Sequence, residues 1–565
     1  MVRVLFCFLL TLMVQGGVFS LPAQKLLYPG DSLYDALTAL SMEQRLIFLS
    51  GSVMTVAQAE LMLAKINDEE LSPGGKVLYE QARAALARPS LLSRNNGLFA
   101  FDFSPGVQPE VYYKTNDKLP WIYGRNSRQP LIPLPVTLSI SSYITAEADL
   151  YLGENRQFSR VNNNYINIPF ETSAEGVDAI DVNTPTRAYV SAGFSFGQGF
   201  GMNFKLGLGD DSLGRTKTGS IILSDNMRGF SYGSLTIYAP FLSYTASVME
   251  LEVTKYLYLH HLQVAILNRL SLSLIGGAMV NAPLELRYLN PMMVFHSFSA
   301  WNSYGDYNDQ MGNPEDLTPW DSRVGSYMGI SVDYRPWKYG RFYALGAMNE
   351  FELSGEGGED SRTPNGLAFQ WGYESWLPVS GEGRTGYVTF GLEGVYTFPY
   401  MYILGNKAWS YYREVPEDPR YREWVGTPFG PDSAAAIFWV GYHNSSRWSA
   451  ELSFLFLAQG ENATTDVFSG NTYRPQSRAE TVATTPTGTA AYTYLIKTRG
   501  AWEVKKWLDL SVQPAYKIVA NYGHIAGNLQ HGFEVAFTAR IIPDIGLLRK
   551  NKDHRRLTGS TSTSR

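Results

Sequence analysis

Apolar residues and small polar residues alternate along most of the chain between about residue 98 and residue 541. In segments such as 245–251, 269–275 and 449–457, apolar or aromatic residues occupy every second position, mainly with Ser, Thr, Glu or Gly between them. A period of two places the two sets on opposite faces of a β-strand. The pattern therefore predicts strands with one apolar and one polar face, as in a membrane barrel with a polar lumen or a soluble sheet with one wet face.

The lengths of the connections favour the membrane barrel. We expect about eighteen strands, near residues 98–104, 135–143, 146–152, 187–196, 202–209, 233–239, 242–251, 255–267, 270–280, 325–334, 341–352, 366–378, 386–396, 434–443, 448–458, 491–502, 507–521 and 532–541. Connections after even-numbered strands are short and those after odd-numbered strands are mostly long, with 252–254 as the clear exception. Short turns at one end and long loops at the other are typical of outer-membrane barrels.

The predicted fold class is therefore all-β membrane: an antiparallel transmembrane β-barrel of about 18 strands (16–18) with a small N-terminal α-helical module. Tryptophans near the predicted strand ends favour an aromatic girdle at the membrane interface. They are Trp337, Trp376, Trp439, Trp448, Trp502 and Trp507. The barrel is expected to occupy residues 91–541.

The region before the barrel divides into a leader and a helical module. Residues 1–20 are typical of a signal peptide, with Arg3 before an apolar run and small residues at the end. Residues 21–90 form the predicted periplasmic helical module, a possible plug. A first helix begins at Asp31, a second follows the capping box of Thr55 and Gln58, and a third begins at Pro73. We expect the second and third helices to pack as a hairpin or small bundle.

The end of the chain differs from the barrel in composition. Residues 542–565 contain a basic run followed by Ser and Thr, which is typical of a disordered tail. An even number of strands places both termini on the periplasmic side of the outer membrane and the long loops outside the cell. We expect the protein to cross the membrane many times as strands, with outer-membrane lipid and the outer-membrane assembly machinery as partners, and to be a monomer.

Composition narrows the classes of function. The 565-residue chain has a net charge of −5, 14% aromatic residues, 18% charged residues and 52 glycines. The charged fraction is low for a soluble protein, whereas aromatics and glycines suit membrane girdles and tight turns. The weak acidity argues against nucleic acid as a partner. Cys7, the only cysteine, lies in the predicted signal peptide, which excludes thiolate chemistry from the mature chain.

Several strings resemble catalytic motifs but lack the required context. Residues 193–197 fit G-x-S-x-G, yet a strand rather than a helix follows. Residues 209–216 approach a phosphate-binding loop but carry Arg for Lys and two carboxylates. His260 and His261 are adjacent on a strand, so they point to opposite faces and do not share a metal. We therefore predict no enzyme activity, no catalytic residues, no metal and no cofactor.

Two long loops carry aromatic residues among charged ones, over residues 295–320 and 409–424. Aromatic faces cover the C–H face of a sugar while carboxylate and guanidinium groups bind its hydroxyls or acidic substituents. The candidate glycan-binding residues are Trp301, Tyr304, Tyr307, Trp320, Trp409, Tyr411, Tyr412 and Trp424. The alternative is that these side chains pack the loops over the mouth of the barrel.

Residues 207–226, GLGDDSLGRTKTGSIILSDN, resemble the glycine-rich turn ending in LSDN of the capsule-assembly Wzi family. Residues 284–296 and 430–432 are similar to segments of Wzi-like barrels. The resemblance implies an eighteen-stranded outer-membrane barrel with N-terminal helices near its periplasmic mouth, and a lectin-like role in holding capsular polysaccharide at the cell surface. The chain departs from the family at 214–216, where a Trp-Gly pair is expected, and the resemblance does not reach the outer loops.

The sequence thus favours an outer-membrane barrel that binds or anchors a surface polysaccharide or glycan. A first alternative is a porin or solute transporter, since a barrel of this size can hold an aqueous channel. Charged residues expected to face inward, such as Lys205, Glu250, Glu350 and Glu374, would line it. A second alternative is a surface adhesin that uses the same loops.

Overall fold

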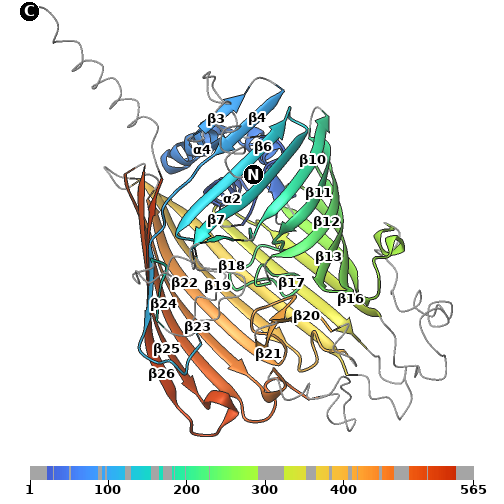
Figure 1. Cartoon of the computed structure of the whole chain (residues 1–565), viewed down its shortest axis with the longest axis vertical. Coiled ribbons are helices and arrows are strands. Elements are labelled where there is room, and N and C mark those ends of the chain that lie inside the picture. Colours follow the sequence, from blue (N-terminus) through green and yellow to red (C-terminus); the bar gives the residue numbers. More distant parts are fainter. Residues whose placement is uncertain are drawn as a thin grey trace, which may run out of the picture.

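The structure is a computed structural model. It describes residues 22–29, 31–49, 53–86, 92–95, 98–120, 129–153, 164–168, 181–183, 185–196, 199–227, 229–290, 324–351, 364–380, 385–404, 410–415, 418–444, 448–463, 483–505 and 507–542. The predicted signal peptide and the predicted tail from residue 543 onward lie outside these residues. Within them, the chain forms a β-barrel with helices at one end (Figure 1).

Long antiparallel strands make the barrel wall. In chain order they are β4 (Phe99–Phe103) with β5 (Glu110–Lys114), β6 (Ile132–Ile140), β7 (Ile144–Gly153), β10 (Ala188–Phe196), β11 (Phe200–Gly209), β12 (Phe230–Tyr238), β13 (Leu242–Glu252), β14 (Lys255–Ile266), β15 (Leu270–Asn281), β16 (Val324–Tyr334), β17 (Gly340–Glu350), β18 (Gly366–Val379), β19 (Gly386–Thr397), β22 (Ser433–Asn444), β23 (Trp448–Gln459), β24 (Ala491–Lys505), β25 (Leu508–Ala520) and β26 (Gln530–Ile541). Three short strands, β3 (Leu92–Asn95), β8 (Tyr165–Ile166) and β9 (Asp181–Asn183), extend the same sheet.

The wall closes through β4 and β5, which act as one long strand. On one side β5 pairs with β26, from Lys114 opposite Glu534 to Glu110 opposite Thr538. On the other side β4 pairs with β6, and the Gly106 N–H continues that ladder by donating to a β6 carbonyl. Counted this way, eighteen antiparallel strands form the closed wall, which removes the unpaired edges that an open sheet would expose.

The wall confirms the predicted fold class and the strands on which it rested. Each predicted segment has a strand in the wall, with bounds that differ by a few residues. Short turns follow β6, β10, β12, β14, β16, β18, β22 and β24, whereas the other connections are mostly longer. The two-residue turn between β13 and β14 is the exception that the sequence indicated. The period-two signal was strong because each strand has a single apolar exterior face.

The exterior of the wall is apolar. On β18, the exposed Phe369 and Trp371 alternate with the buried Ala368 and Gln370. Further exposed apolar side chains on the strands include Phe204, Leu206, Ile330, Leu392, Phe438, Phe454, Ile496, Val512 and Phe537. An outward apolar band with an inward polar face is the pattern by which a barrel meets the hydrocarbon of a membrane.

Only some of the tryptophans predicted to form a girdle lie on the outer face of the wall. Trp337, Trp448 and Trp502 are about half exposed on the exterior. Trp439, by contrast, is only 4% exposed and carries the Lys217 ammonium 5.1 Å from its ring centroid, so it faces the interior. Trp376 stacks on His443, with ring centroids 5.2 Å apart. Proximity to a strand end therefore did not determine which face of the wall a tryptophan occupies.

Three helices form the N-terminal module, as predicted. They are α2 (Ser32–Glu43), α3 (Val56–Ala64) and α4 (Pro73–Leu86), with the small strands β1 (Leu26–Leu27) and β2 (Met54–Thr55) pairing beside them. Thr55 and Gln58 form the predicted capping box, each side chain bonding the other's backbone N–H. No described helix is long and apolar enough to cross a membrane.

Of the two expected packings of these helices, the structure has the small bundle and not the hairpin. Both α3 and α4 pack on α2, which supplies Leu37 and Leu40 to a shared buried cluster. Met62 and Leu63 of α3 enter this cluster, whereas Ala64 is exposed. A nine-residue helix with apolar residues on several faces presents more than one possible stripe, and packing on α2 selects one of them.

The module lies at the end of the barrel that carries the short turns (Figure 1). Backbone hydrogen bonds join it to the turn after β14, where the Ile47 N–H donates to Asn268 O at 2.8 Å. A second bond joins the turn after β16, where the Tyr339 N–H donates to Met42 O at 3.0 Å. Side chains also bind inward-facing residues, as in the 2.9 Å ion pair of Lys25 with Glu147. The module thus covers part of this opening of the barrel.

Candidate functional site

Most of the predicted glycan-binding residues cannot be placed, and the rest are buried. Trp301, Tyr304, Tyr307, Trp320 and Trp409 lie outside the described residues. Tyr411 and Tyr412 are fully buried and Trp424 is 6% exposed. In this arrangement the three described rings contact the protein interior, so they offer no face to a sugar.

These three rings belong to a loop that folds into the barrel. The described residues of this loop, 398–404, 410–415 and 418–432, include the hairpin of β20 (Tyr412–Val415) and β21 (Asp418–Trp424) and pack against the described residues 210–227 between β11 and β12. The two loops share a buried cluster with inward residues of β12 to β19 and β22. Its loop members are Leu213, Ile221, Ile222, Leu223, Met227, Met401, Tyr402, Ile403, Tyr411, Tyr412, Trp424 and Val425. The polar lumen expected of such a barrel therefore contains an apolar core along this side.

Hydrogen bonds fix residues 210–229 at the centre of that core. The Tyr327 hydroxyl on β16 donates to the carbonyls of Ile221 and Ile222 at 3.0 and 2.7 Å. The Tyr402 hydroxyl donates to the same Ile221 carbonyl at 2.6 Å, and the Ser224 N–H bonds the second loop at Val425 O. Satisfied backbone groups allow an irregular loop to be buried without a large desolvation cost.

A buried carboxylate holds the start of the same loop. Glu393 on β19 is fully buried and accepts hydrogen bonds from the Lys217 and Thr218 N–H groups at 2.6 and 2.9 Å. The Thr218 and Tyr343 hydroxyls donate to it as well. Lys217 then extends across the lumen to Glu451 on β23, with Nζ 2.6 Å and 2.7 Å from the two carboxylate oxygens. This segment, chosen in the sequence for its family resemblance, is thus the main internal element of the barrel.

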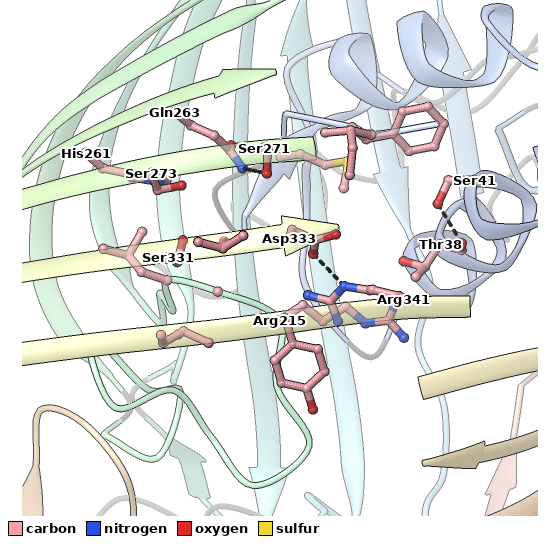
Figure 2. Close-up of a pocket in the computed structure, with 18 of the residues that line it drawn as sticks. Thr38, Ser41, Arg215, His261, Gln263, Ser271, Ser273, Ser331, Asp333 and Arg341 are labelled. Carbon is pink, nitrogen blue, oxygen red and sulfur yellow. Dashed lines mark hydrogen bonds and ion pairs between the residues drawn. The ribbon is translucent and has the colours of Figure 1, made fainter. Parts of the chain in front are cut away.

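A small cavity of about 70 Å³ lies where the module, this loop and the wall meet (Figure 2). Thr38 and Ser41 of α2 face polar side chains of β14, β15 and β16 across it. On its charged side, Arg341 Nε bonds Asp333 Oδ2 at 2.5 Å, and Arg341 Nη1 bonds Glu374 at 2.8 Å. The cavity therefore separates the module from the wall by an ionic and polar layer.

The polar layer is held partly by long ion pairs. Four buried atoms that line this space have no hydrogen-bond partner among the described residues: Arg215 Nη1, Arg335 Nε, Asp333 Oδ1 and Gln263 Oε1. The Arg335 Nε and Asp333 Oδ1 atoms are 3.8 Å apart, and Arg215 Nη1 lies 3.9 Å from Glu374 Oε1. A space of this size holds roughly two water molecules, which would bridge such atoms. Burial lowers the pKa of Arg335, in the turn after β16, to about 10 despite the nearby Asp333 charge.

The opposite side of the lumen contains a much larger space. A cavity of about 1010 Å³ lies between α2 and α4 and the inward faces of β5 and β23 to β26. Its wall side carries charged and polar groups, including Glu110, Arg499, Ser511, Gln513 and Arg540. Its module side is apolar, with Leu33, Ala36, Leu78 and Ala82. One cavity therefore presents two chemically distinct surfaces to a ligand.

The predicted channel-lining residues fall into different environments. Lys205 and Glu374 face inward as expected but are buried, so neither borders an open channel. Glu250 does not face inward as predicted: Met249 and Leu251 are the inward residues of that part of β13, and the Glu250 carboxylate accepts a hydrogen bond from the Tyr256 hydroxyl at 3.3 Å on the exterior. The side chain of Glu350 lies outside the described set. Sequence reasoning missed the groups that do border the large cavity, although Arg499 and Arg540 occupy inward positions on strands that it predicted correctly.

The two adjacent histidines point to opposite faces of β14, as predicted. His260 is held on the exterior by the Tyr244 hydroxyl at 2.7 Å and the Tyr288 carbonyl at 2.6 Å. His261 lines the small interior cavity. Among the described residues, no group of three or more His, Cys, Asp and Glu side chains has an arrangement suited to a metal ion.

Comparison with solved structures identifies the fold. The chain is similar to Wzi of Escherichia coli, described as an outer-membrane protein involved in group 1 capsule assembly and a carbohydrate-binding β-barrel, with a TM-score of 0.55 and 13% identity over 91% of this chain and 98% of that one. It also matches Pseudomonas aeruginosa OccK5 (TM-score 0.37, 9% identity, 78% and 99% covered) and the Acinetobacter baumannii outer-membrane channel DcaP (TM-score 0.32, 9% identity, 81% and 100% covered).

No family model matches the sequence, and no curated protein matches it. At 13% identity, the likeness to Wzi bears on the fold alone. The chain thus has the fold of outer-membrane β-barrels of the Wzi type, with helices preceding the first strand of the wall.

Proposed function

We propose that this protein is an outer-membrane barrel that binds a surface polysaccharide or glycan and does not act as a wide pore. The observation that carries the proposal is the packing into the lumen of the described parts of the two loops, 210–227 and, in the second loop, 398–404, 410–415 and 418–432. Their apolar core occupies the side formed by β12 to β19 and β22, and the helical module covers part of the opening at the short-turn end. A barrel filled by its own chain suits a binding protein better than a channel.

The orientation belongs to the same proposal. Short turns and the helices would face the periplasm, and the long connections would face outward, as in other outer-membrane barrels. The apolar exterior of the strands supports residence in a membrane. The likeness to Wzi, whose description includes carbohydrate binding, supports a saccharide as the ligand. We propose a binding role without catalysis.

Conductance and glycan binding test the proposal together. We expect the refolded chain 21–565 to give no steady single-channel current in planar bilayers and to bind selected saccharides on a glycan array. A matched chain that lacks residues 21–90 should conduct, because the large cavity would then open toward the short-turn end. Steady current from chain 21–565 would contradict the proposal.

The large cavity gives a specific reason to keep a solute channel as the second candidate. Its charged wall and its volume of about 1010 Å³ are compatible with a narrow path beside the filled side. A channel predicts ion-selective current from the intact chain and no saturable saccharide binding. The two measurements therefore separate the candidates.

A further inference from the structure

Helix α3 and two short turns of the wall border an apolar cavity at the short-turn end of the barrel. Its volume is about 230 Å³. Phe48, Met62 and Ala64 line it from the module, and Gly199 and Pro240 line it from the turns after β10 and β12. It lies next to the small polar cavity, since Phe48 and Met62 line both. Along this part of their contact, the module and the wall therefore leave an apolar space between them.

The cavity lies close to the outward, apolar face of the wall. Phe200 follows Gly199 directly on β11 and is 51% exposed, and Ile237 on β12 is 49% exposed. Both alternate with buried inward residues of their strands, so they face outward. At the rim of the cavity Ala64 and Lys65 are exposed, so the space reaches the surface. The two turns thus have the cavity on one side and the lipid-facing exterior on the other.

Lys65 supplies a cation at the rim of this cavity. Its Nζ lies 3.5 Å from the carbonyl oxygen of Pro240, at the limit of a hydrogen bond. No described carboxylate forms an ion pair with it. Surrounding protein atoms partly desolvate the ammonium group and lower its pKa. An anion at the rim would offset this desolvation, because a nearby opposite charge favours the charged form.

The lining favours an acyl chain over a polar ligand. Apart from Lys65, the polar side chains that line the cavity are Gln58 and Tyr238, and Gln58 already accepts the cap hydrogen bond from the Thr55 N–H. A saccharide needs more hydrogen-bond partners than these, and a free phosphate ion would make no use of the apolar surface. An apolar cavity of roughly 150 Å³ is large enough to take up benzene, so this one has room for part of a hydrocarbon chain.

We infer that this cavity binds a phospholipid of the leaflet at the short-turn end, with one acyl chain between α3 and the turns after β10 and β12 and the phosphate at Lys65. The second chain stays in the leaflet, beside outward residues such as Phe200. A lipid in this position contacts the module and the wall together. The site is independent of saccharide binding, because it rests on the barrel fold and on the contact between module and wall.

The test is native mass spectrometry of chain 21–565, refolded in detergent without lipid. The probes are dioleoylphosphatidylglycerol and dioleoylglycerol, which have the same acyl chains and differ in the phosphate-containing headgroup. We expect one molecule of phosphatidylglycerol to bind more tightly than any further copy. Dioleoylglycerol should bind about threefold more weakly, as the loss of an exposed charge pair implies.

Two variants separate the cavity from the cation. Ala64→Trp fills the cavity from an exposed position without removing a buried side chain, and it should abolish the tight binding of both probes. Lys65→Gln keeps the cavity and should weaken phosphatidylglycerol about threefold while leaving dioleoylglycerol unchanged. Val77→Trp and Lys76→Gln, at exposed positions of α4 outside this cavity, are the matched controls and should bind both probes as the parent does.

Folding of each variant is checked by its heat-dependent shift on gel electrophoresis. Equally tight binding by Ala64→Trp and the parent would overturn the cavity as the lipid site. Unchanged phosphatidylglycerol affinity in Lys65→Gln would overturn the contact with the phosphate. Oleate that binds more tightly than phosphatidylglycerol would overturn a phospholipid as the occupant. Saccharide binding on the glycan array should be the same for Ala64→Trp and the parent, so failure of the lipid site leaves the proposed function standing.

Discussion

The two sides of the lumen share one strand pattern but have different contents. Along β17 and β18 the inward residues Tyr343, Leu345 and Ala368 are apolar or aromatic and contact the buried loops. Along β24 and β26 the inward residues Arg499 and Arg540 are charged, and both line the large cavity. The comparison teaches that the alternation of apolar and inward positions specifies the strands of the wall. The chemistry of each inward side chain instead matches the loop or the cavity that it contacts.

The largest expected effect comes from emptying the filled side. Replacing residues 211–228 by a short Gly-Ser linker removes every member of the apolar cluster that the first loop supplies, so water should enter beside β12 to β19. We expect a single-channel current larger than that of the chain lacking residues 21–90, which leaves this cluster in place. A silent linker variant that still shows the heat-dependent gel shift would mean that the second loop alone closes this side.

A smaller change compares the packing of the two sides directly. Ile222→Ala removes a fully buried side chain from the filled side and should lower the free energy of unfolding by about 2–5 kcal/mol. Ser511→Ala, on the wall of the large cavity, should change it by less than about 0.5 kcal/mol. Denaturant unfolding in detergent measures both. Equal losses would show that the two sides are packed alike.

The loop anchor at Glu393 should have an intermediate effect. Glu393→Gln keeps the shape but replaces one accepting oxygen by an amide that faces backbone donors. We expect a loss of about 1.5–3 kcal/mol, since hydrogen bonds to charged groups are involved. Faster hydrogen exchange at Lys217 and Thr218 would locate the change. Glu69→Gln, on an exposed turn of the module, is the control and should leave the exchange unaltered.

The smallest expected change in stability concerns the contact between the helical module and the barrel wall. Burial, the largest single effect, would lower the pKa of Lys25. The charge and hydrogen bond of Glu147, together with the charges of Asp149 and Asp102, outweigh burial and raise the pKa above the usual 10.5. A raised pKa means that the ion pair stabilises docking fully below pH 10.5 and that this contribution is lost as the pH rises through the raised pKa. We expect a change of about 0–1 kcal/mol, measured as hydrogen exchange at Leu26 and Leu27. With Lys25→Arg the loss should move to higher pH; an identical profile would exclude Lys25 as the titrating group.

The strands of the wall were predictable from the sequence because each one depends on a pattern of neighbouring residues. A strand with one lipid-compatible face needs an apolar residue at every second position, and this repeats eighteen times. Helix starts were predictable for the same reason, since Thr55 and Gln58 satisfy backbone groups within one turn. Which face of α3 is buried was not predictable, because it depends on α2, which a local pattern does not include.

The contents of the lumen were not predictable in this way. Tyr411, Tyr412 and Trp424 lie in an aromatic loop with charged neighbours, a composition shared by sugar-binding surfaces and by loops that pack inward. Lys217 and Lys497 meet only because a loop crosses the barrel, and they are far apart in the chain. The alternation of inward and outward positions along β24 was the one feature of the sequence that indicated that Lys497 and Arg499 face the lumen.

The pairing of β5 with β26 also determines when the barrel wall can close. Thr538 bonds Glu110 across a sequence separation of 428 residues, so the ring has no closing partner until almost the whole chain has left the ribosome. Before that moment the two outermost strands present open edges. A chain that stopped before β26 would therefore keep these two edges, however complete the rest of its wall.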